Sequence, residues 1–371
     1  MKPVLTLGAL STGRDNNVLL LRMIAALAVV YGHAFGFTGH NSDEPFNRFF
    51  GLNPSNIGVD VFFVISGFLI AKSFQRKDLV TFAWARATRI YPALWVSTIA
   101  LVVLVGAFLT PLPAAEFWLR HDTLTYIAKN STMLPGPGSQ IRLPFAFDSH
   151  TSEFNDSLWT LPHELQMYML LALVGVCGLL RRPFAALALM LFGAIAFSGD
   201  LLGFAHPLEL ERARFLFMFF AGTTFYLLRD YVPMRGDIVL ASILLCVLVA
   251  IATRNYAAHR LMLAAMVPYA VLWFSFVPGG PIRRYNTFGD YSYGTYILAA
   301  PIQVFLALRI HSCPALLNFT YALLLVLPLS ALSWHLLESP ALSLGLPKWL
   351  ARIRQRLQTS PDRKLKSPTR S

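Results

Sequence analysis

The chain has 371 residues, of which 56% are apolar and only 13% are charged. This balance excludes an ordinary soluble domain, in which about a quarter of the residues are charged, and it indicates a membrane protein. The formal net charge is +12, but no aromatic-basic reading motif accompanies it, which argues against a nucleic-acid partner. Cys177, Cys246 and Cys313 stand singly in or beside apolar runs, so they predict neither a disulfide framework nor a metal site.

Ten apolar segments are about as long as a helix that spans a bilayer, which needs roughly 20 residues. They cover 17–37, 57–74, 90–110, 158–180, 183–203, 211–229, 237–253, 259–277, 288–308 and 314–337. We therefore expect an all-α fold, a polytopic transmembrane bundle of about ten spans. No small-residue cleavage site follows the first segment, so we expect it to remain as a helix.

Basic residues in the short loops predict the orientation, because Lys and Arg concentrate on the cytoplasmic side of a membrane. They separate spans two and three, four and five, and eight and nine: Arg76, Lys77, Arg86, Arg89, Arg181, Arg182, Arg283 and Arg284. The opposite loops collect acidic residues. Both termini are therefore predicted to be cytoplasmic, and the longest connection, 111–157, to lie outside.

The chain is expected to form one membrane unit with no internal repeat. Residues 1–16 are a cytoplasmic lead, 17–342 the membrane domain and 343–371 a basic tail. In the tail, "WLARIRQRL" places Trp349 and Ile353 on one helical face, as in an interfacial helix on anionic lipid. In the outer connection, "EFWLRHDTLTYIAKNSTML" predicts an amphipathic helix, and "LPGPGSQ" excludes regular helix.

Two ionisable residues interrupt the first span, "LRMIAALAVVYGH". Arg22 lies in its inner third and His33 near its outer end, about 16 Å apart along the axis and nearly on one face. A snorkelling arginine and an interfacial histidine are the structural alternatives for each residue alone. Their shared face favours a functional role, because ionisable groups inside a bilayer are costly.

Two further spans carry carboxylates. Asp60 in "IGVDVFFVISGFLI" enters from outside near the depth of His33, and Ser66 and Gly67 permit close helix packing. Glu164 in "SLWTLPHELQMYMLL" lies one to two turns inside an apolar helix. Its structural alternative is to cap the N-terminus of that helix, where negative charge is favourable. We expect the two carboxylates and the histidine at one level, where one carboxylate orients the imidazole. Spacing leaves open which one.

The stretch "RKDLVTFAWARATRIYP" supplies Arg86 and Arg89 ahead of the third span. Their i, i+3 spacing places two guanidinium groups on one helical face, which suits phosphate. The positive-inside rule also predicts basic residues here, so both interpretations stay open.

Six motifs in order resemble those of one family: "LRMIAALAVVYGH" with its Arg-x10-His pattern, "GVDVFFVISGFLI", "RATRIYPALW", "NDSLWTLPHELQMYML", "FGDYSYGTYILAAPIQ" and "SWHLLESPAL". The chain is similar to compact, single-domain, exopolysaccharide-type members of the acyltransferase-3 family. The resemblance runs from about residue 16 to residue 342. His163 departs from it, because an aromatic or acidic residue is expected there.

The resemblance implies acyl transfer, most often of acetyl, from cytoplasmic acyl-coenzyme A to a hydroxyl of an extracytoplasmic or lipid-linked glycan. We therefore expect an O-acetyltransferase of the bacterial inner membrane, with acyl-coenzyme A, a carbohydrate acceptor and the lipid bilayer as partners, and without a permanently bound cofactor or metal. The resemblance marks as functional positions His33, Arg22, Arg86, Arg89 and Glu164.

The expected mechanism uses both ends of the bundle. The donor's phosphates dock against the two arginines of the third span, and its pantetheine arm passes Arg22. His33, oriented by Glu164 or Asp60, then removes the proton from the acceptor hydroxyl. In a second version His33 takes the acyl group covalently before passing it on.

A multi-pass transporter or glycan flippase is the alternative, since buried His, Arg and Glu also form relays. Transporters commonly show inverted repeats and discontinuous helices near the midplane. The sequence indicates neither, and its polar residues avoid the midplane.

Overall fold

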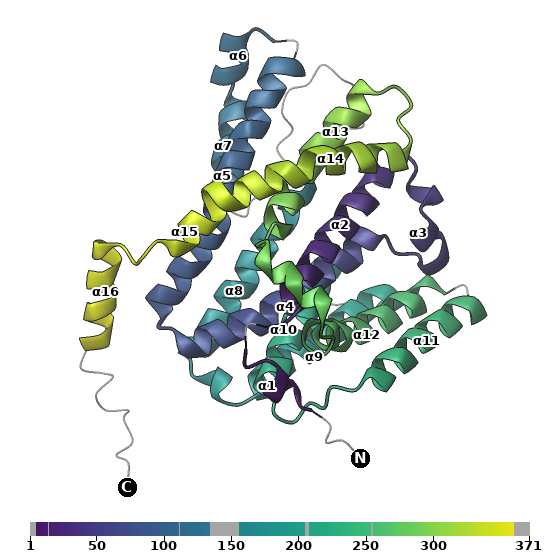
Figure 1. Cartoon of the computed structure of the whole chain (residues 1–371), viewed down its shortest axis with the longest axis vertical. Coiled ribbons are helices and arrows are strands. Elements are labelled where there is room, and N and C mark those ends of the chain that lie inside the picture. The colour runs from purple at the N-terminus through teal and green to yellow at the C-terminus, as the bar shows by residue number, and fades with distance from the viewer. Residues whose placement is uncertain are drawn as a thin grey trace.

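The computed structural model describes residues 5–13, 15–110, 112–133, 156–204, 208–253 and 255–359. Within these ranges the chain is almost entirely helical (Figure 1), and the predicted all-α bundle is confirmed. Ten long helices coincide with the ten apolar segments: α2 (Val18–Phe37), α4 (Pro54–Arg76), α5 (Leu79–Phe108), α8 (Thr160–Val176), α9 (Phe184–Leu202), α10 (Leu210–Leu227), α11 (Gly236–Ala252), α12 (Tyr256–Phe276), α13 (Ser292–Arg309) and α14 (Ala315–Ser333).

Six shorter helices and several single turns connect and flank the long ones. The helices are α1 (Leu7–Leu10), α3 (Pro45–Phe50), α6 (Ala114–Leu119), α7 (His121–Thr132), α15 (Ser339–Ser343) and α16 (Lys348–Thr359). The 3₁₀ turns are Asn41–Asp43, Asp156–Trp159, Leu179–Arg181 and Pro281–Thr287, and a π-helical segment, Trp334–Glu338, joins α14 to α15.

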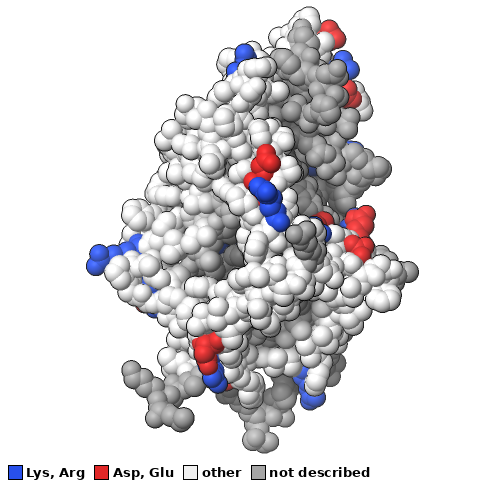
Figure 2. Space-filling model, turned by 90° about the vertical axis from the view of Figure 1, so that its right-hand side faces the viewer, with Lys and Arg blue, Asp and Glu red and all other residues white. Residues whose placement is uncertain are grey.

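Length and composition identify this chain as a multi-pass membrane protein. Among the described residues, six helices are long and apolar enough to cross a bilayer, and α13 with its bent 3₁₀ lead makes a seventh. Many large apolar side chains on α9, α11 and α14 face outward, among them Ile195, Ile251 and Leu324. In Figure 2 the visible face is mostly free of charged side chains, as expected of a surface in contact with lipid. A total of ten spans stays a prediction.

Loops predicted to share a side of the membrane meet at the same end of the bundle. At the inner end, Arg283 Nη1 lies 2.7 Å from Asp15 Oδ2 and ties the lead before α13 to the segment before α2. At the outer end, Arg260 at the start of α12 donates two hydrogen bonds to the carbonyl oxygen of Gly51. Both contacts agree with the predicted grouping of the loops; which end is cytoplasmic stays a prediction, and the terms inner and outer follow it.

Helix α4 lies at the centre of the bundle because glycines let its neighbours approach closely. A Cβ atom added at Gly67 would collide with the backbone carbonyl of Phe219, and one at Gly222 would collide with the carbonyl of Val64. Thr223 Oγ1 also donates to the carbonyl oxygen of Gly67, at 3.2 Å. The close helix packing expected at Gly67 is confirmed, between α4 and α10.

The outer connection contains two helices where one amphipathic helix was expected. Arg120 has an extended backbone, with φ −65° and ψ 135°, and separates α6 from α7. The break lets both Phe117 and Tyr126 become buried beside the end of α5, and Trp95 Nε1 donates to Ser131 O at 2.9 Å. The "LPGPGSQ" stretch lies outside the described residues.

The predicted helix of the tail is present as α16. It stands apart from the bundle (Figure 1) and is joined to it by an ion pair between Arg354 Nε and Asp78 Oδ2, at 3.1 Å. Trp349 and Ile353 on its apolar face are exposed. Such a face suits a lipid surface, and its attachment to anionic lipid stays a prediction.

The close packing of α4 and α10 predicts a specific loss of stability. Gly67→Ala should destabilise the protein by about 1–3 kcal/mol, because the added methyl group meets backbone that cannot move aside easily. Thermal unfolding of the purified protein in detergent measures the effect. Gly279→Ala is the matched control, since a Cβ there meets open space. An equal unfolding midpoint for the two variants would contradict this account.

Candidate functional site

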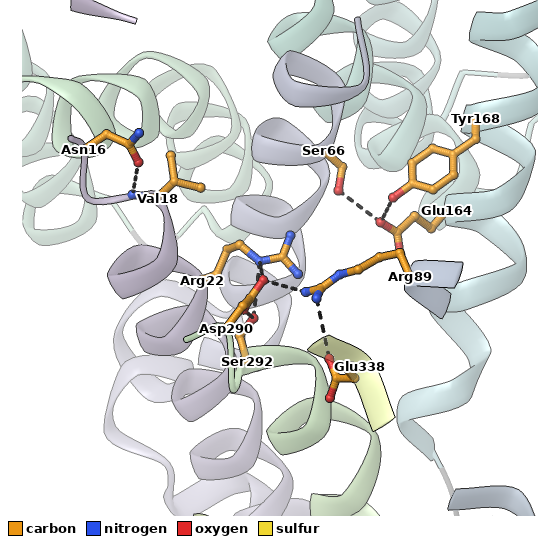
Figure 3. A network of polar contacts seen from close by, with 10 residues as sticks. All are labelled: Asn16, Val18, Arg22, Ser66, Arg89, Glu164, Tyr168, Asp290, Ser292 and Glu338. Atoms are coloured by element: carbon orange, nitrogen blue, oxygen red, sulfur yellow. Dashed lines mark hydrogen bonds and ion pairs between the residues drawn. The ribbon is translucent and has the colours of Figure 1, made fainter. Parts of the chain in front are cut away.

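A buried network of four charged side chains lies at the inner end of the bundle (Figure 3). Arg22 and Arg89 point at Asp290 from opposite sides. Arg22 Nε is 3.3 Å from Asp290 Oδ2 and Arg89 Nη2 is 2.5 Å from it. Arg89 Nη1 also lies 3.5 Å from Glu338 Oε2. The two positive and two negative charges balance, and they join α2 and α5 to the lead of α13 and the end of α14.

Local backbone features place Asp290 where it meets both arginines. Gly289 has φ +115°, which glycine adopts without strain, and a Cβ there would collide with the Trp334 indole. Ser292 Oγ donates to Asp290 Oδ1 and accepts a hydrogen bond from Arg22 Nε, at 3.2 Å. Asp290 is therefore held between the backbone turn at Gly289 and Ser292 in the first turn of α13.

Glu338 belongs to the π-helical segment after α14. Its Oε1 accepts a hydrogen bond of 2.9 Å from Ser333 Oγ, and its side chain is almost fully buried. Single π turns often occur at functional sites. The sequence analysis missed both Glu338 and Asp290, although each lies in a quoted motif and an ionisable residue beside an apolar run is the signal that identified Arg22.

Arg86 and Arg89 differ in their surroundings. The Arg89 guanidinium lies 5.7 Å from the Tyr293 ring centre and 5.8 Å from that of Trp334, in addition to its two ion pairs. Arg86 Nε is buried and has no hydrogen-bond partner among the described residues. Its nearby charged or ionisable groups include Glu164 and Tyr168. Arg86 is thus the arginine with unused donor capacity.

Asp60 and Glu164, the two carboxylates expected to meet His33, have other partners among the described residues. Glu164 accepts hydrogen bonds from Ser66 Oγ, at 3.0 Å, and from Tyr168 Oη. Ser66 lies six residues deeper in α4 than Asp60, about 9 Å along the axis, so Glu164 lies nearer the inner network (Figure 3). Asp60 pairs with a different helix, and in the described part of the chain neither carboxylate hydrogen-bonds to His33.

His33 lines a cavity of about 390 Å³ at the outer end of α2. Its wall carries three side-chain amides, of Asn41, Asn53 and Asn56, and the hydroxyl of Ser55. Asn53 Oδ1 accepts a hydrogen bond of 2.9 Å from the backbone N–H of Ser55. Asn53 thus caps the N-terminus of α4 at the edge of the cavity. The described wall of the cavity therefore combines an imidazole with amide and hydroxyl groups.

His163 does not line this cavity. Its ring packs between Trp159, at 5.8 Å, and Phe215, at 5.4 Å between ring centres. The imidazole thus packs as an aromatic ring would, at a position where the family pattern has an aromatic or acidic residue.

A smaller cavity of about 40 Å³ lies between the His33 cavity and the inner network. It is lined by Arg22 and Glu164, and it shares Val59 and Tyr296 with the His33 cavity. Two adjoining cavities, of which the smaller is mostly apolar, therefore lie between the inner ion network and the imidazole. Arg22 lines the smaller cavity and His33 the larger one, so the two residues lie on the same side of α2.

Comparisons with known proteins give a consistent assignment. A sequence-family model described as an acyltransferase domain matches residues 15–335. An O-acetyl transferase of Shigella phage Sf6 is 31% identical over 346 residues, which cover 88% of this chain and 96% of that protein. Nodulation protein 10 of Rhizobium leguminosarum bv. viciae is 31% identical over 179 residues, 44% of this chain and 45% of that protein. No solved structure shows a significant match.

The inner network predicts strong coupling between its members. Asp290→Asn should cost about 3–5 kcal/mol of stability, because it leaves two buried guanidinium groups without their shared anion. Adding Arg89→Gln should then cost less than it does alone, with a coupling of about 0.5–3 kcal/mol. Thermal unfolding of the single and double variants measures this.

The exposed pair Arg120–Asp122, with a 3.1 Å separation, provides the matched control cycle. Its coupling should stay below about 1 kcal/mol. Additive losses at Asp290 and Arg89 would show that their contact does not hold the helices together.

Proposed function

Because the chain belongs to the acyltransferase-3 family, we propose that it is an O-acetyltransferase of the bacterial inner membrane. It transfers an acetyl group from acetyl-coenzyme A on the cytoplasmic side to a hydroxyl of an extracytoplasmic or lipid-linked glycan, such as exopolysaccharide or lipopolysaccharide. The near full-length similarity to the O-acetyl transferase of phage Sf6 supports the acetyl group. The family match lends no support to the transporter or flippase alternative.

The observation that carries this proposal is the pair of adjoining cavities between Arg22 and His33. The two residues stand about 16 Å apart along α2, and their cavities meet at Val59 and Tyr296. An extended pantetheine arm would reach His33 along this line from the inner end, and the smaller cavity, about 40 Å³ here, would have to widen to admit it. The donor thus enters from the inner side and the acceptor from the outer side.

At the inner end, Arg86 is the best candidate to bind the phosphates of the donor. Its buried Nε lacks a partner among the described residues, and a guanidinium grips phosphate through charge-assisted hydrogen bonds. Arg22 and Arg89 are already balanced by Asp290 and Glu338. We assign them to shaping the passage that the arm follows.

At the outer end, His33 acts as a general base. It takes the proton from an acceptor hydroxyl while the oxygen attacks the thioester carbonyl carbon, and the coenzyme A thiolate leaves and receives a proton. An acyl-histidine intermediate is the second route. The amides around His33 suit a hydroxyl-rich acceptor, because they both donate and accept hydrogen bonds. Glu164 and Asp60 are not direct partners of the imidazole, so any effect of theirs on catalysis is indirect.

His33→Ala should lower the transfer of acetyl groups by about 10²–10⁴-fold, while the protein stays folded and still binds acetyl-coenzyme A. Membranes with labelled acetyl-coenzyme A and the surface glycan of a strain lacking this protein provide the assay. His121→Ala, an exposed histidine on the outer surface, should keep wild-type transfer. Near-normal transfer by His33→Ala would dismiss the assignment.

Arg86→Gln should weaken binding of acetyl-coenzyme A by at least about 10-fold, since hydrogen bonds to charged groups contribute about 1.5–3 kcal/mol. It should hardly change the binding of S-acetylpantetheine, which lacks the phosphates. Arg182→Gln, at an exposed position of another inner loop, controls for the general positive charge. Equal losses of affinity for the two ligands, or in the two variants, would show that Arg86 contributes only to the orientation of the protein in the membrane.

A further inference from the structure

A second polar cavity, of about 80 Å³, adjoins the His33 cavity on the side away from the inner network. It lies between α4, α9, α10 and α12, and Asn56 lines both cavities. Four charged side chains line it: Asp60, Glu211, Arg214 and Arg260. The mechanism above uses none of them directly, so their presence beside the reaction cavity needs another explanation.

The central residues of this cavity are deeply buried and imperfectly paired. The side chains of Asp60 and Arg214 are 5% and 4% exposed, with Arg214 Nε 3.4 Å from Asp60 Oδ1. Arg214 Nη2 also lies 2.5 Å from Glu211 Oε2. Even so, within the described ranges Asp60 Oδ1, Arg214 Nε and Arg214 Nη2 make no hydrogen bond of good geometry. Buried polar atoms are nearly always hydrogen-bonded, so these atoms have unused capacity at the cavity wall.

The chemistry of the wall favours a neutral ligand rich in hydroxyl groups. Two carboxylates and two guanidinium groups give no net charge, which favours neither an anion nor a cation. Carboxylates only accept hydrogen bonds and guanidinium groups only donate them, whereas a hydroxyl does both at once. A hydroxyl in the cavity, which can accept from Arg214 and donate to Asp60, therefore suits this wall better than any single ion does.

The size of the cavity limits what enters it. At about 80 Å³ it has about a fifth of the volume of the His33 cavity, so it suits the hydroxyl groups at one edge of a sugar better than a whole sugar unit. The neighbouring His33 cavity, at about 390 Å³, has room for the rest of a sugar unit. One edge of a sugar can thus enter the smaller cavity while another hydroxyl meets the imidazole.

We propose that this cavity is a subsite for the acceptor glycan, in which Asp60 and Arg214 bind the hydroxyl groups of one sugar unit and thereby select the acceptor. The subsite rests on the proposed function for the identity of its ligand. It gives Asp60 a role in acceptor binding in place of the expected role in orienting His33. Arg260, which donates to Gly51 O at 3.1 and 2.9 Å, holds the segment between α3 and α4, whose Leu52 lines the subsite.

The test uses the full chain in nanodiscs and, as probe, de-O-acetylated surface polysaccharide from a strain that lacks this protein. Its binding is measured first without acetyl-coenzyme A. The double variant Asp60→Asn with Arg214→Gln keeps the net charge of the pair and replaces both side chains by neutral amides. It should bind the polysaccharide at least about 10-fold more weakly, with its affinity for acetyl-coenzyme A within twofold of wild type. Glu211→Gln, whose side chain is 36% exposed, serves as a second variant that disturbs the fold least, with a smaller loss in the same direction.

Arg120→Gln with Asp122→Asn neutralises an exposed ion pair on the outer surface and should bind like wild type. Equal polysaccharide binding by wild type and the folded Asp60 and Arg214 variant would overturn the subsite, as would a wild-type protein that binds no polysaccharide. Transfer of labelled acetyl groups is measured separately. A wild-type protein that binds the polysaccharide but transfers no acetyl group would contradict the proposed function and leave the subsite standing.

Discussion

The contact of Asp290 with two arginines is the interaction on which the rest of this structure depends. Four charged side chains in a mostly apolar bundle are costly to bury, and only mutual pairing offsets that cost. The pairing fixes α2, α5, the lead of α13 and the π-helical end of α14 relative to one another. Because Arg22 is held in this way, the same helix carries His33 at a fixed height above the inner end.

This arrangement separates the two ends of the proposed reaction. Charged groups gather at the inner end, where the proposed polyanionic donor would enter, and side-chain amides line the cavity of the imidazole at the outer end. The apolar length of one helix lies between them. In the proposed reaction, the two cavities that share Val59 and Tyr296 would let a thioester and a hydroxyl meet while the bulk of each substrate stays on its own side of the membrane.

Helix α4 connects these parts. Its glycine faces bring α2 and α10 into backbone contact, and its other positions line all three polar cavities, with Asn56 and Val59 at their boundaries. Close packing at Gly67 and polar lining at Asp60 occur within two turns of one helix. The same tight contact that stabilises the bundle therefore sets the spacing between the base and the proposed acceptor subsite.

The sequence by itself determined the helices, their approximate bounds and the common face of Arg22 and His33, because each of these follows from hydrophobic length and helical period within one segment. It also marked Arg86, Arg89, Asp60 and Glu164 as residues that need an explanation. Only the tertiary structure decided their partners. The depth of Glu164 depends on the axial offset between α8 and α4. The pairing of Asp60 depends on Arg214, which belongs to a helix about 150 residues away. Such axial offsets are set by side chains that interlock between helices, so no spacing within a single segment contains them.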